Sequence, residues 1–383
     1  MSAVRKIQGR LEGIESLRAY AAVAVIFFHL VGTGGAKLPE TLSFIGTHFG
    51  FGVPLFFVVS GFSLSYGYWQ KLNDGEDVSS YFKRRLARIA PLFYAVLLFE
   101  MILHWAVWGK IYGPSEVLVN ALFMFNIIPH MTDGIVWASW SIGVEMIFYV
   151  LFPLLLLVCR SLTSTMLALV VSTIVATLFT LGIQPFEAQL MSFMHHNFVT
   201  NVPYFLWGIL AYHVHARVSG LAQADRRPVC WALCAVSLAS ILTLYFGTSL
   251  YEYFTGRGLR TTWEMLWGVP FATVSVAMAL HPSRLLSNPV TRYLGNISFS
   301  LYLVHPIIVW GFGTLGVYTW VYALFPQSEV TGYLGSMAVA LSMVTAISVF
   351  TFKYIEKPGM KWGKQWARGT SAKTKAVPVS LIS

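Results

Sequence analysis

The sequence predicts an all-α protein, a polytopic membrane helix bundle of about ten transmembrane helices. First, 56% of its residues are hydrophobic and 11% are charged, whereas soluble chains average roughly 45–50% and 25%. Second, apolar runs of membrane length recur along the 383 residues. Third, the basic residues behind the net charge of +10 separate these runs. Because they do not gather on one solvated face, we expect no nucleic-acid partner.

A helix needs about 20 mostly apolar residues to cross the hydrocarbon core of a bilayer. The run 115–130 is shorter than this and contains Asn120 and Asn126. We therefore expect it to form a re-entrant or interfacial helix on the outer side. Ten other segments are long enough to span: 16–34, 48–70, 90–110, 136–158, 162–183, 198–216, 229–247, 263–281, 295–316 and 333–355.

The charge distribution orients these ten predicted spans. Both termini and every second loop then share one side, which collects 22 of the 26 Lys and Arg residues. The positive-inside rule makes that side cytoplasmic. A crossing by 115–130 would invert all later spans and destroy the asymmetry. The other side keeps only Lys37, Lys110, Arg257 and Arg260.

The spans leave no room for a soluble domain. We predict a transmembrane domain over 1–360 and a flexible basic cytoplasmic tail over 361–383. The N-terminal apolar stretch is interpreted as an uncleaved first helix, since cleavage near 32–36 would remove Arg18 and His29. All three cysteines fall at or near the cytoplasmic side, where thiols stay reduced, so a disulfide framework is not expected.

Arg18 and His29 lie on one face of the first predicted helix. They are eleven residues apart, almost three full turns, or about 16 Å of helical rise. An ionisable residue at mid-membrane depth indicates a functional site. The structural alternative remains open: Arg18 can be an interfacial anchor and His29 an interhelical hydrogen-bonding residue.

Arg85 and Arg88 stand at the cytoplasmic start of the third predicted helix, within "FKRRLARIAPLFY". The spacing i, i+3 puts both guanidinium groups on one face, which suits a polyphosphate ligand. The positive-inside rule alone explains some cations here. It does not require three arginines within five residues, so an anionic ligand is favoured.

Several further polar residues fall inside predicted spans. Glu145 carries a carboxylate that must pair, protonate or line water. Ser60 belongs either to a helix packing seam or to a substrate channel. His305 precedes Pro306, where a kink frees a backbone carbonyl. The candidates for an acceptor or pocket wall are Glu15, Ser60, Trp140, Ser141, Tyr149, Tyr302 and His305.

Five blocks in order resemble acyltransferase family 3, multi-spanning bacterial membrane O-acyltransferases that modify cell-surface polysaccharides and some secreted molecules. The resemblance covers about 11–360. A closing "YIEKP" follows the blocks "LEGIESLRAYAAVAVIFFH", "PLFFVVSGFSLS", "FKRRLARIAPLFY", "WSIGVEMIFYVLFP" and "LGNISFSLYLVHP".

The resemblance implies transfer of an acyl group, usually acetyl, from cytoplasmic acetyl-CoA to a sugar hydroxyl. It makes His29 the catalytic histidine with Arg18 as its motif partner. It assigns Arg85 and Arg88 to the CoA donor. Glu145 becomes the acidic residue of the tryptophan-serine motif, acting on an imidazole or on the sugar.

The resemblance also implies what accompanies the enzyme. It is expected in the bacterial cytoplasmic (inner) membrane, with acyl-CoA as donor and a saccharide or glycolipid as acceptor. No permanently bound cofactor or metal is expected, and polysaccharide-assembly proteins are admitted as partners. The family's first block usually reads Asp-Gly-Leu-Arg, so the role of Glu15 is open.

Two other classes of function compete with this interpretation. In a proton-coupled transporter or flippase, His29 and Glu145 would relay protons across the bilayer. Against it, the sequence contains no convincing internal repeat of the kind common in transporters. In a membrane scaffold or sensor, the polar residues would only pack helices and would tolerate substitution.

Overall fold

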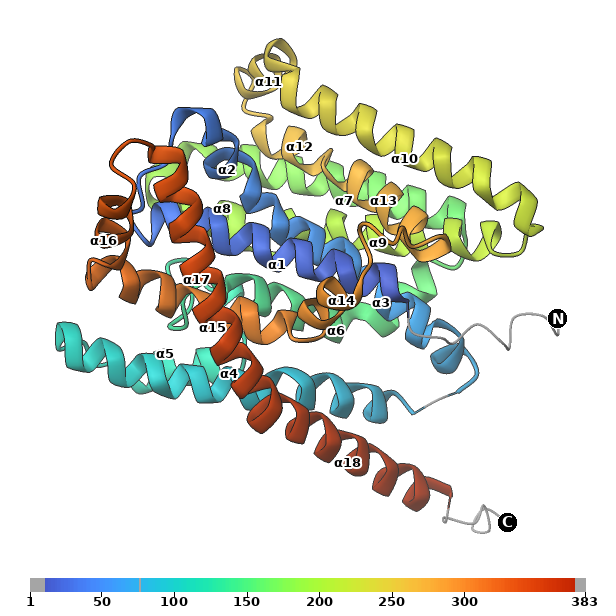
Figure 1. Ribbon diagram of the computed structural model, residues 1–383. Coiled ribbons are helices and arrows are strands. Elements are labelled where there is room, and N and C mark those ends of the chain that lie inside the picture. Colours follow the sequence, from blue (N-terminus) through green and yellow to red (C-terminus); the bar gives the residue numbers. More distant parts are fainter. Residues whose placement is uncertain (1–10, 76, 376–383) are drawn as a thin grey trace, which may run out of the picture.

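The computed structural model of the protein describes residues 11–75 and 77–375. In these ranges the chain is built from helices joined by short turns, with no β-strand. Figure 1 shows the long helices lying side by side, with α1 near the middle of the bundle and α10 at one edge. The all-α prediction is confirmed.

Each of the ten predicted spans contains a helix. In the described part of the chain, eight helical stretches are long and apolar enough to cross a membrane, and the bent pair α14 and α15 makes nine. One stretch, Leu162–Val218, has 57 residues and contains two membrane-length helices, which brings the number to about ten. The helices are α1 (Glu12–Gly32), α3 (Gly52–Asn73), α4 (Val78–Trp108), α6 (Trp140–Val158), α7 (Leu162–Ile183), α9 (Phe198–Val218), α10 (Gln223–Phe246), α12 (Arg260–Met265) with α13 (Gly268–Leu280), α14 (Pro289–Asn296) with α15 (Ser298–Thr314), and α17 (Glu329–Thr351).

Short helices join the long ones. The run 115–130 forms α5 (Pro114–Ala121) and a 3-10 turn at Phe125–Ile127. A helix of eight residues rises only about 12 Å, so this run does not cross, as predicted. Sequence patterns did not reveal the other short helices: α2 (Ser43–His48), α8 (Glu187–His196), α11 (Thr248–Thr255) and α16 (Val317–Leu324).

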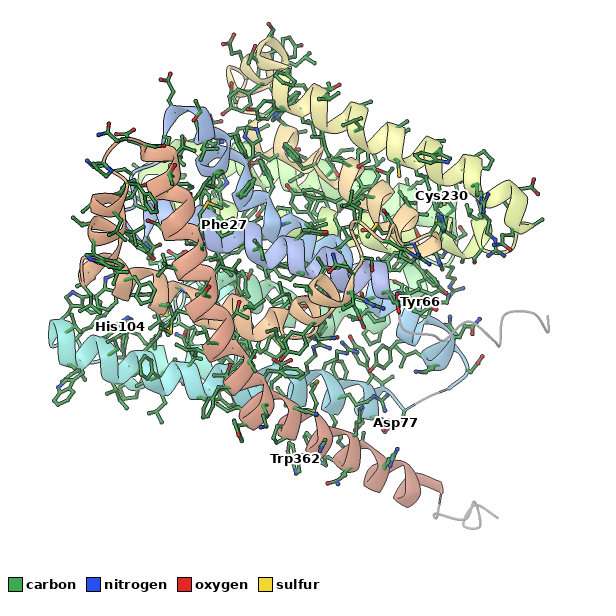
Figure 2. The ribbon with its side chains drawn as sticks, viewed as in Figure 1. Phe27, Tyr66, Asp77, His104, Cys230 and Trp362 are labelled. Carbon is green, nitrogen blue, oxygen red and sulfur yellow. The ribbon has the colours of Figure 1, made fainter. Side chains whose placement is uncertain are left out.

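The bundle has two ends with different charge. We call the end where α1 begins, α3 ends and α4 begins the basic end, and the other the opposite end. Figure 2 shows Asp77 and Trp362 toward the basic end and His104 at the opposite end. At the start of α4, Asp77 accepts hydrogen bonds from the backbone N–H groups of Ser79 and Ser80, which caps the helix.

Small residues allow α1 to sit at the centre. Ala21 and Ala22 are fully buried. A side chain at Gly295 would approach the Glu15 carbonyl oxygen to 1.8 Å, and one at Gly13 would approach the Met278 carbonyl oxygen to 2.1 Å. Close backbone approach is the usual basis of helix packing in membranes. It fixes α1 against α13 and α14.

A second close crossing joins α3 to α9. A Cβ atom at Gly61 would lie 2.3 Å from the Phe205 carbonyl oxygen, and one at Gly208 would lie 2.1 Å from that of Val58. Next to the crossing, the rings of Phe57 and Phe205 stack at 4.6 Å. These contacts fix α3, which contributes to both cavities described below.

We predicted a flexible basic tail over 361–383. Within it, residues 361–375 belong to helix α18 (Lys357–Lys375), which packs along α4 (Figure 1). The Lys83 ammonium lies 5.2 Å from the centre of the Trp366 ring, a favourable contact that sequence patterns do not reveal. Residues 376–383 lie outside the described part.

Candidate functional site

A polar cavity lies between helices α1, α3, α4, α6 and α15. It holds about 580 Å³ of space, its open part included. We call it the arginine cavity, because Arg18 and Arg88 form its positive wall. Its lining residues are Arg18, Phe56, Phe57, Arg88, Ile89, Ser141, Ile142, Glu145, Tyr149, Ser298, Phe299 and Tyr302.

The predicted cations gather here, but in unequal positions. Arg18 lies within electrostatic range of Arg85, Arg88 and Glu145. Arg88 lines the cavity. Arg85 lies one turn away, with its guanidinium 4.7 Å from the centre of the Tyr68 ring and 5.7 Å from that of Tyr149. Arg85 therefore supports the cavity wall from behind Tyr149.

Glu145 is the acidic group of the arginine cavity. Its Oε1 accepts hydrogen bonds from the Ser60 hydroxyl at 2.7 Å and the Tyr149 hydroxyl at 2.6 Å. Tyr149 follows Glu145 by one turn of α6, whereas Ser60 comes from α3. The carboxylate is thereby held between two helices, facing Arg18.

Tyr302 and Ser141 close the cavity on the α15 side. The Tyr302 hydroxyl donates to the Ala138 carbonyl oxygen at 2.9 Å and accepts from the Ser141 hydroxyl at 2.7 Å. Ala138 adopts a positive φ of 59°, an uncommon conformation for a residue with a side chain. This arrangement fixes the start of α6 against α15.

His29 and His305 form a pair directly above Tyr302. His305 Nδ1 donates to the Tyr302 carbonyl oxygen at 2.6 Å, and His29 Nδ1 donates to that of Val25 at 2.9 Å. The neutral His305 ring then has a lone pair on Nε2, which lies 3.2 Å from His29 Nδ1. In this arrangement, His29 carries its proton on Nδ1 and a lone pair on Nε2. A lone pair on Nε2 suits a base.

The other predicted residues have different locations. Trp140 lines a second cavity at the opposite end, described below. Glu15 is half-buried near the start of α1, and its backbone packs against Gly295 of α14. His29 hydrogen-bonds to His305, while Glu145 hydrogen-bonds to Ser60 and Tyr149. Within the described residues, His305 is therefore the side chain that orients the His29 imidazole.

Glu356 is a candidate that sequence reasoning missed. It ends the π-helical turn Phe352–Glu356, is fully buried and accepts a hydrogen bond from Ser300 at 2.9 Å. It interacts electrostatically with Arg88 and Arg18. The available signals were its place in "YIEKP" and the frequent use of π-bulges at functional sites.

The cavity's donor set suits an anion and a proton transfer. Arginine pairs bind phosphates through forked hydrogen bonds, and a buried imidazole with a fixed tautomer can act as a base. Within 11–75 and 77–375, no group of three His, Cys, Asp or Glu residues is arranged to hold a metal ion.

Fold and site together define a multi-pass membrane protein with a charged cavity inside its helix bundle. Comparison with known families adds the chemistry. A family model described as an acyltransferase domain matches residues 11–352. The chain belongs to this acyltransferase family, as its motifs predicted.

Three curated relatives illustrate the range of the family. The chain is 25% identical to the putative peptidoglycan O-acetyltransferase YrhL of Bacillus subtilis strain 168, over 78% of this chain and 49% of the relative. It is 27% identical to the putative acetyltransferase ORF330 of Acidianus two-tailed virus, over 79% and 85%. It is 24% identical to O-acetyltransferase OatA of Staphylococcus aureus strain NCTC 8325, over 97% and 62%.

The chain thus spans about half the length of YrhL and less than two thirds of OatA. No solved structure matches it.

Proposed function

We propose that this protein is a membrane O-acyltransferase that moves an acetyl group from acetyl-CoA to a hydroxyl of a cell-surface or exported saccharide. The observation that carries the proposal is the position of the histidine pair directly above a cavity with an arginine wall. His305 binds the carbonyl of Tyr302, and Tyr302 lines that cavity together with Arg18 and Arg88.

The donor enters from the basic end. Arg88 binds phosphate oxygens of CoA, with Arg18 beside it and Arg85 behind the wall. Glu145 interacts electrostatically with Arg18, and Glu356 with Arg88 and Arg18, which offsets the repulsion between these cations. The pantetheine arm extends along α1, where about 16 Å of helical rise separate Arg18 from His29.

The chemical step uses the lone pair on His29 Nε2. This atom removes the proton from the acceptor hydroxyl as the hydroxyl oxygen attacks the thioester carbonyl. The carbon–sulfur bond then breaks, and the leaving CoA thiolate takes up the proton from His29. A positioned general base contributes typically ~10²–10⁴-fold to rate. A variant in which His29 carries the acetyl group transiently fits the same residues.

The relatives support the nature of the acceptor. YrhL is named a putative peptidoglycan O-acetyltransferase and OatA an O-acetyltransferase. From these names we propose that this protein also acts on a saccharide or glycolipid acceptor, with polysaccharide-assembly proteins as partners. By the positive-inside rule we assign the basic end to the cytoplasm of a bacterium, with the bundle in its inner membrane and both termini cytoplasmic.

Acetyl-CoA binding tests the donor half of the proposal. The full chain is reconstituted in nanodiscs and titrated with acetyl-CoA. We expect Arg88→Ala to weaken binding about tenfold to hundredfold, because a charged hydrogen bond contributes ~1.5–3 kcal/mol. Arg160→Ala is the matched control, since Arg160 is exposed at the basic end and does not line the cavity.

Failure of folded wild-type protein to bind acetyl-CoA would overturn the proposed function. Equal weakening by Arg88→Ala and Arg160→Ala would instead indicate nonspecific attraction to a basic surface. The proton-relay alternative predicts no CoA binding, and no contact among the described residues favours it.

A further inference from the structure

A second and larger cavity opens at the opposite end of the bundle. It holds about 1860 Å³ of space, its open part included. Its walls come from α1, the segment 46–54, α6, α8, α9 and the segment from the end of α10 to Trp267. About 730 Å³ of this space is accessible to a ligand, and sites for single small ligands measure about 300–1,000 Å³. The cavity therefore has room for a short chain of linked rings.

Aromatic rings form much of its surface, and we call it the aromatic cavity. The Phe51 and Trp267 rings stack at 4.7 Å, and the Tyr245 ring lies 4.9 Å from the His48 ring. Tyr245 and Tyr251 are each 40% exposed, so their rings present surface to a ligand. Flat rings match the apolar C–H faces of pyranose sugars, while their polar edges and hydroxyls bind water or ligand.

Hydrogen-bonding groups stand among the rings. Asn201, Thr200 and Thr261 line the cavity, and their side chains belong to types that both donate and accept hydrogen bonds. The Asn201 amide donates to the carbonyl oxygens of His195 and Asn197 at 2.8 Å, which fixes its orientation. A ligand rich in hydroxyl groups matches this mixture.

The charge of the aromatic cavity is balanced. Among its lining residues, Arg260 and Glu264 carry full charges, and they form an ion pair at 2.9 Å. A paired guanidinium attracts an anion less strongly than the two cavity arginines of the basic end. The charge pattern favours a neutral ligand.

The two cavities approach each other near the histidine pair, although neither histidine is among their lining residues. Phe28, whose ring lies edge-on to His29 at 5.3 Å, lines the aromatic cavity, and Tyr302 below His305 lines the arginine cavity. On α6, Trp140 lines one cavity and Ser141 the other. The aromatic cavity therefore reaches Phe28, the residue next to His29, from the end of the bundle away from the arginines.

We propose that the aromatic cavity is the acceptor site and binds a neutral oligosaccharide segment, so that donor and acceptor enter from opposite ends of the bundle. This inference rests on the proposed function, because an acceptor site exists only if the protein transfers an acyl group. Binding of a saccharide to this cavity can nevertheless be measured without any donor.

The experiment titrates the full chain in nanodiscs with two probes, cellohexaose and an oligoglucuronate of equal length. We expect the neutral probe to bind more tightly. We expect Tyr251→Ala and Tyr245→Ala each to weaken its binding about threefold to tenfold, because an aromatic contact contributes ~0.5–1.5 kcal/mol. Trp267→Ala should weaken it at least as much.

Tyr253→Ala is the matched control. Tyr253 lies on the same short helix as Tyr251, is 53% exposed and does not line the cavity. Because Trp267 is 7% exposed, its variant can lose folding. Tyr245 and Tyr251 are partly exposed, so their alanine variants should fold and can still test the inference. The melting temperature of each variant is measured as a check on folding.

Three results would overturn the inference: no binding of cellohexaose, tighter binding of the acidic probe, or equal weakening by Tyr251→Ala and Tyr253→Ala. The donor titration above separates this outcome from failure of the proposed function. Saccharide binding without acetyl-CoA binding would overturn the proposed acyltransferase function and would leave a saccharide-binding site. Acetyl-CoA binding without saccharide binding would support the acyltransferase function and would overturn the inference about the aromatic cavity.

Discussion

The two cavities differ in charge, size and origin. The arginine cavity is narrow, has a wall of positive charge and is built from residues on five long helices. The aromatic cavity is wide, electrically balanced and takes much of its wall from short helices and turns. A rigid charged site suits a ligand with constant chemistry, such as CoA. A wall of short segments suits a ligand that varies between related proteins.

The histidine pair lies at the junction between these two environments, next to Phe28 of the aromatic cavity and Tyr302 of the arginine cavity. Its orientation depends on backbone carbonyls of α1 and α15, both central helices. A base placed at this junction can meet a donor from one side and an acceptor from the other. The contrast between the cavities therefore predicts three classes of substitution: those that weaken donor binding, those that slow the chemical step at the histidine pair, and those that weaken acceptor binding.

The largest effect is expected from His29→Ala. Loss of the general base should reduce acetyl transfer by ~10²–10⁴-fold while leaving acetyl-CoA binding within twofold of wild type, because phosphate contacts lie at the basic end. Single-turnover transfer and equilibrium titration measure the two quantities separately.

His281→Ala is the control, because His281 is exposed beyond the end of α13. Full transfer activity in His29→Ala would remove His29 from the mechanism and leave the enzyme class untouched.

A smaller effect is expected from His305, the residue that positions His29. His305→Leu removes one of the two acceptors of the His29 Nδ1 proton, the other being the Val25 carbonyl oxygen, and kcat should fall about 10- to 100-fold, as when an orienting partner is removed at metal sites. His305→Gln keeps an acceptor oxygen and should recover most of that loss. Steady-state kinetics with a KM unchanged in both variants checks the role.

Equal losses in the leucine and glutamine variants would show that His305 only fills space. The His305 side chain is fully buried, so its replacement can change stability. The melting temperatures of both variants are therefore measured, and their kinetics are compared at a temperature where both are folded.

Stability should respond to Gly61→Ala, at the crossing that holds α3 between both cavities. The added Cβ would meet the Phe205 carbonyl oxygen at 2.3 Å, and overpacking costs about 1–3 kcal/mol. We expect a lower melting temperature in detergent, with donor and saccharide binding weakened together.

Gly67→Ala on the same helix is the control, because no neighbouring atom lies within 4 Å of the position that its added methyl group would take. An unchanged melting temperature in Gly61→Ala would mean that α3 and α9 can separate without cost.

The smallest effect is expected at Asp133, in the turn beside the aromatic cavity. A hydrogen bond from His196 Nδ1, 2.7 Å long, holds the pKa of Asp133 below its usual range. A lowered pKa stabilises the folded state at pH values above the unfolded pKa, and this contribution disappears as pH falls through the folded pKa. Asp133→Asn should therefore lower the melting temperature by a small amount at pH 5, and the difference from wild type should shrink as pH falls below about 4.

A difference in melting temperature that stays unchanged from pH 5 down to pH 2 would contradict this assignment. His196 also stacks on Trp140 at 4.2 Å, so saccharide binding is measured in parallel.

Much of the fold was predictable because hydropathy acts locally. Ten spans, the short run 115–130 and the all-α class follow from runs of apolar residues and from charge between them. The helix in 361–375 was not predictable in this way, because its support comes from packing along α4 and from a contact between Trp366 and Lys83. Neither is visible in the composition of the segment.

The sequence identified individual residues of the candidate site, but it did not show which of them share a cavity. Arg18, Arg88, Glu145 and Tyr149 were all singled out, and they line one cavity. Trp140 and Ser141 looked equivalent in sequence and line different cavities. Glu356 was missed, since a glutamate near basic residues resembles a surface residue until burial is known.

The sequence by itself determined the membrane-length helices, their alternating direction, the shared face of Arg18 and His29 and the family. The tertiary structure alone decided that His29 meets His305, 276 residues later, and that Ser60 binds Glu145, 85 residues later. Apolar periodicity fixes how one segment folds. Contacts between distant helices depend instead on where small residues let backbones approach, and that is a property of pairs of helices.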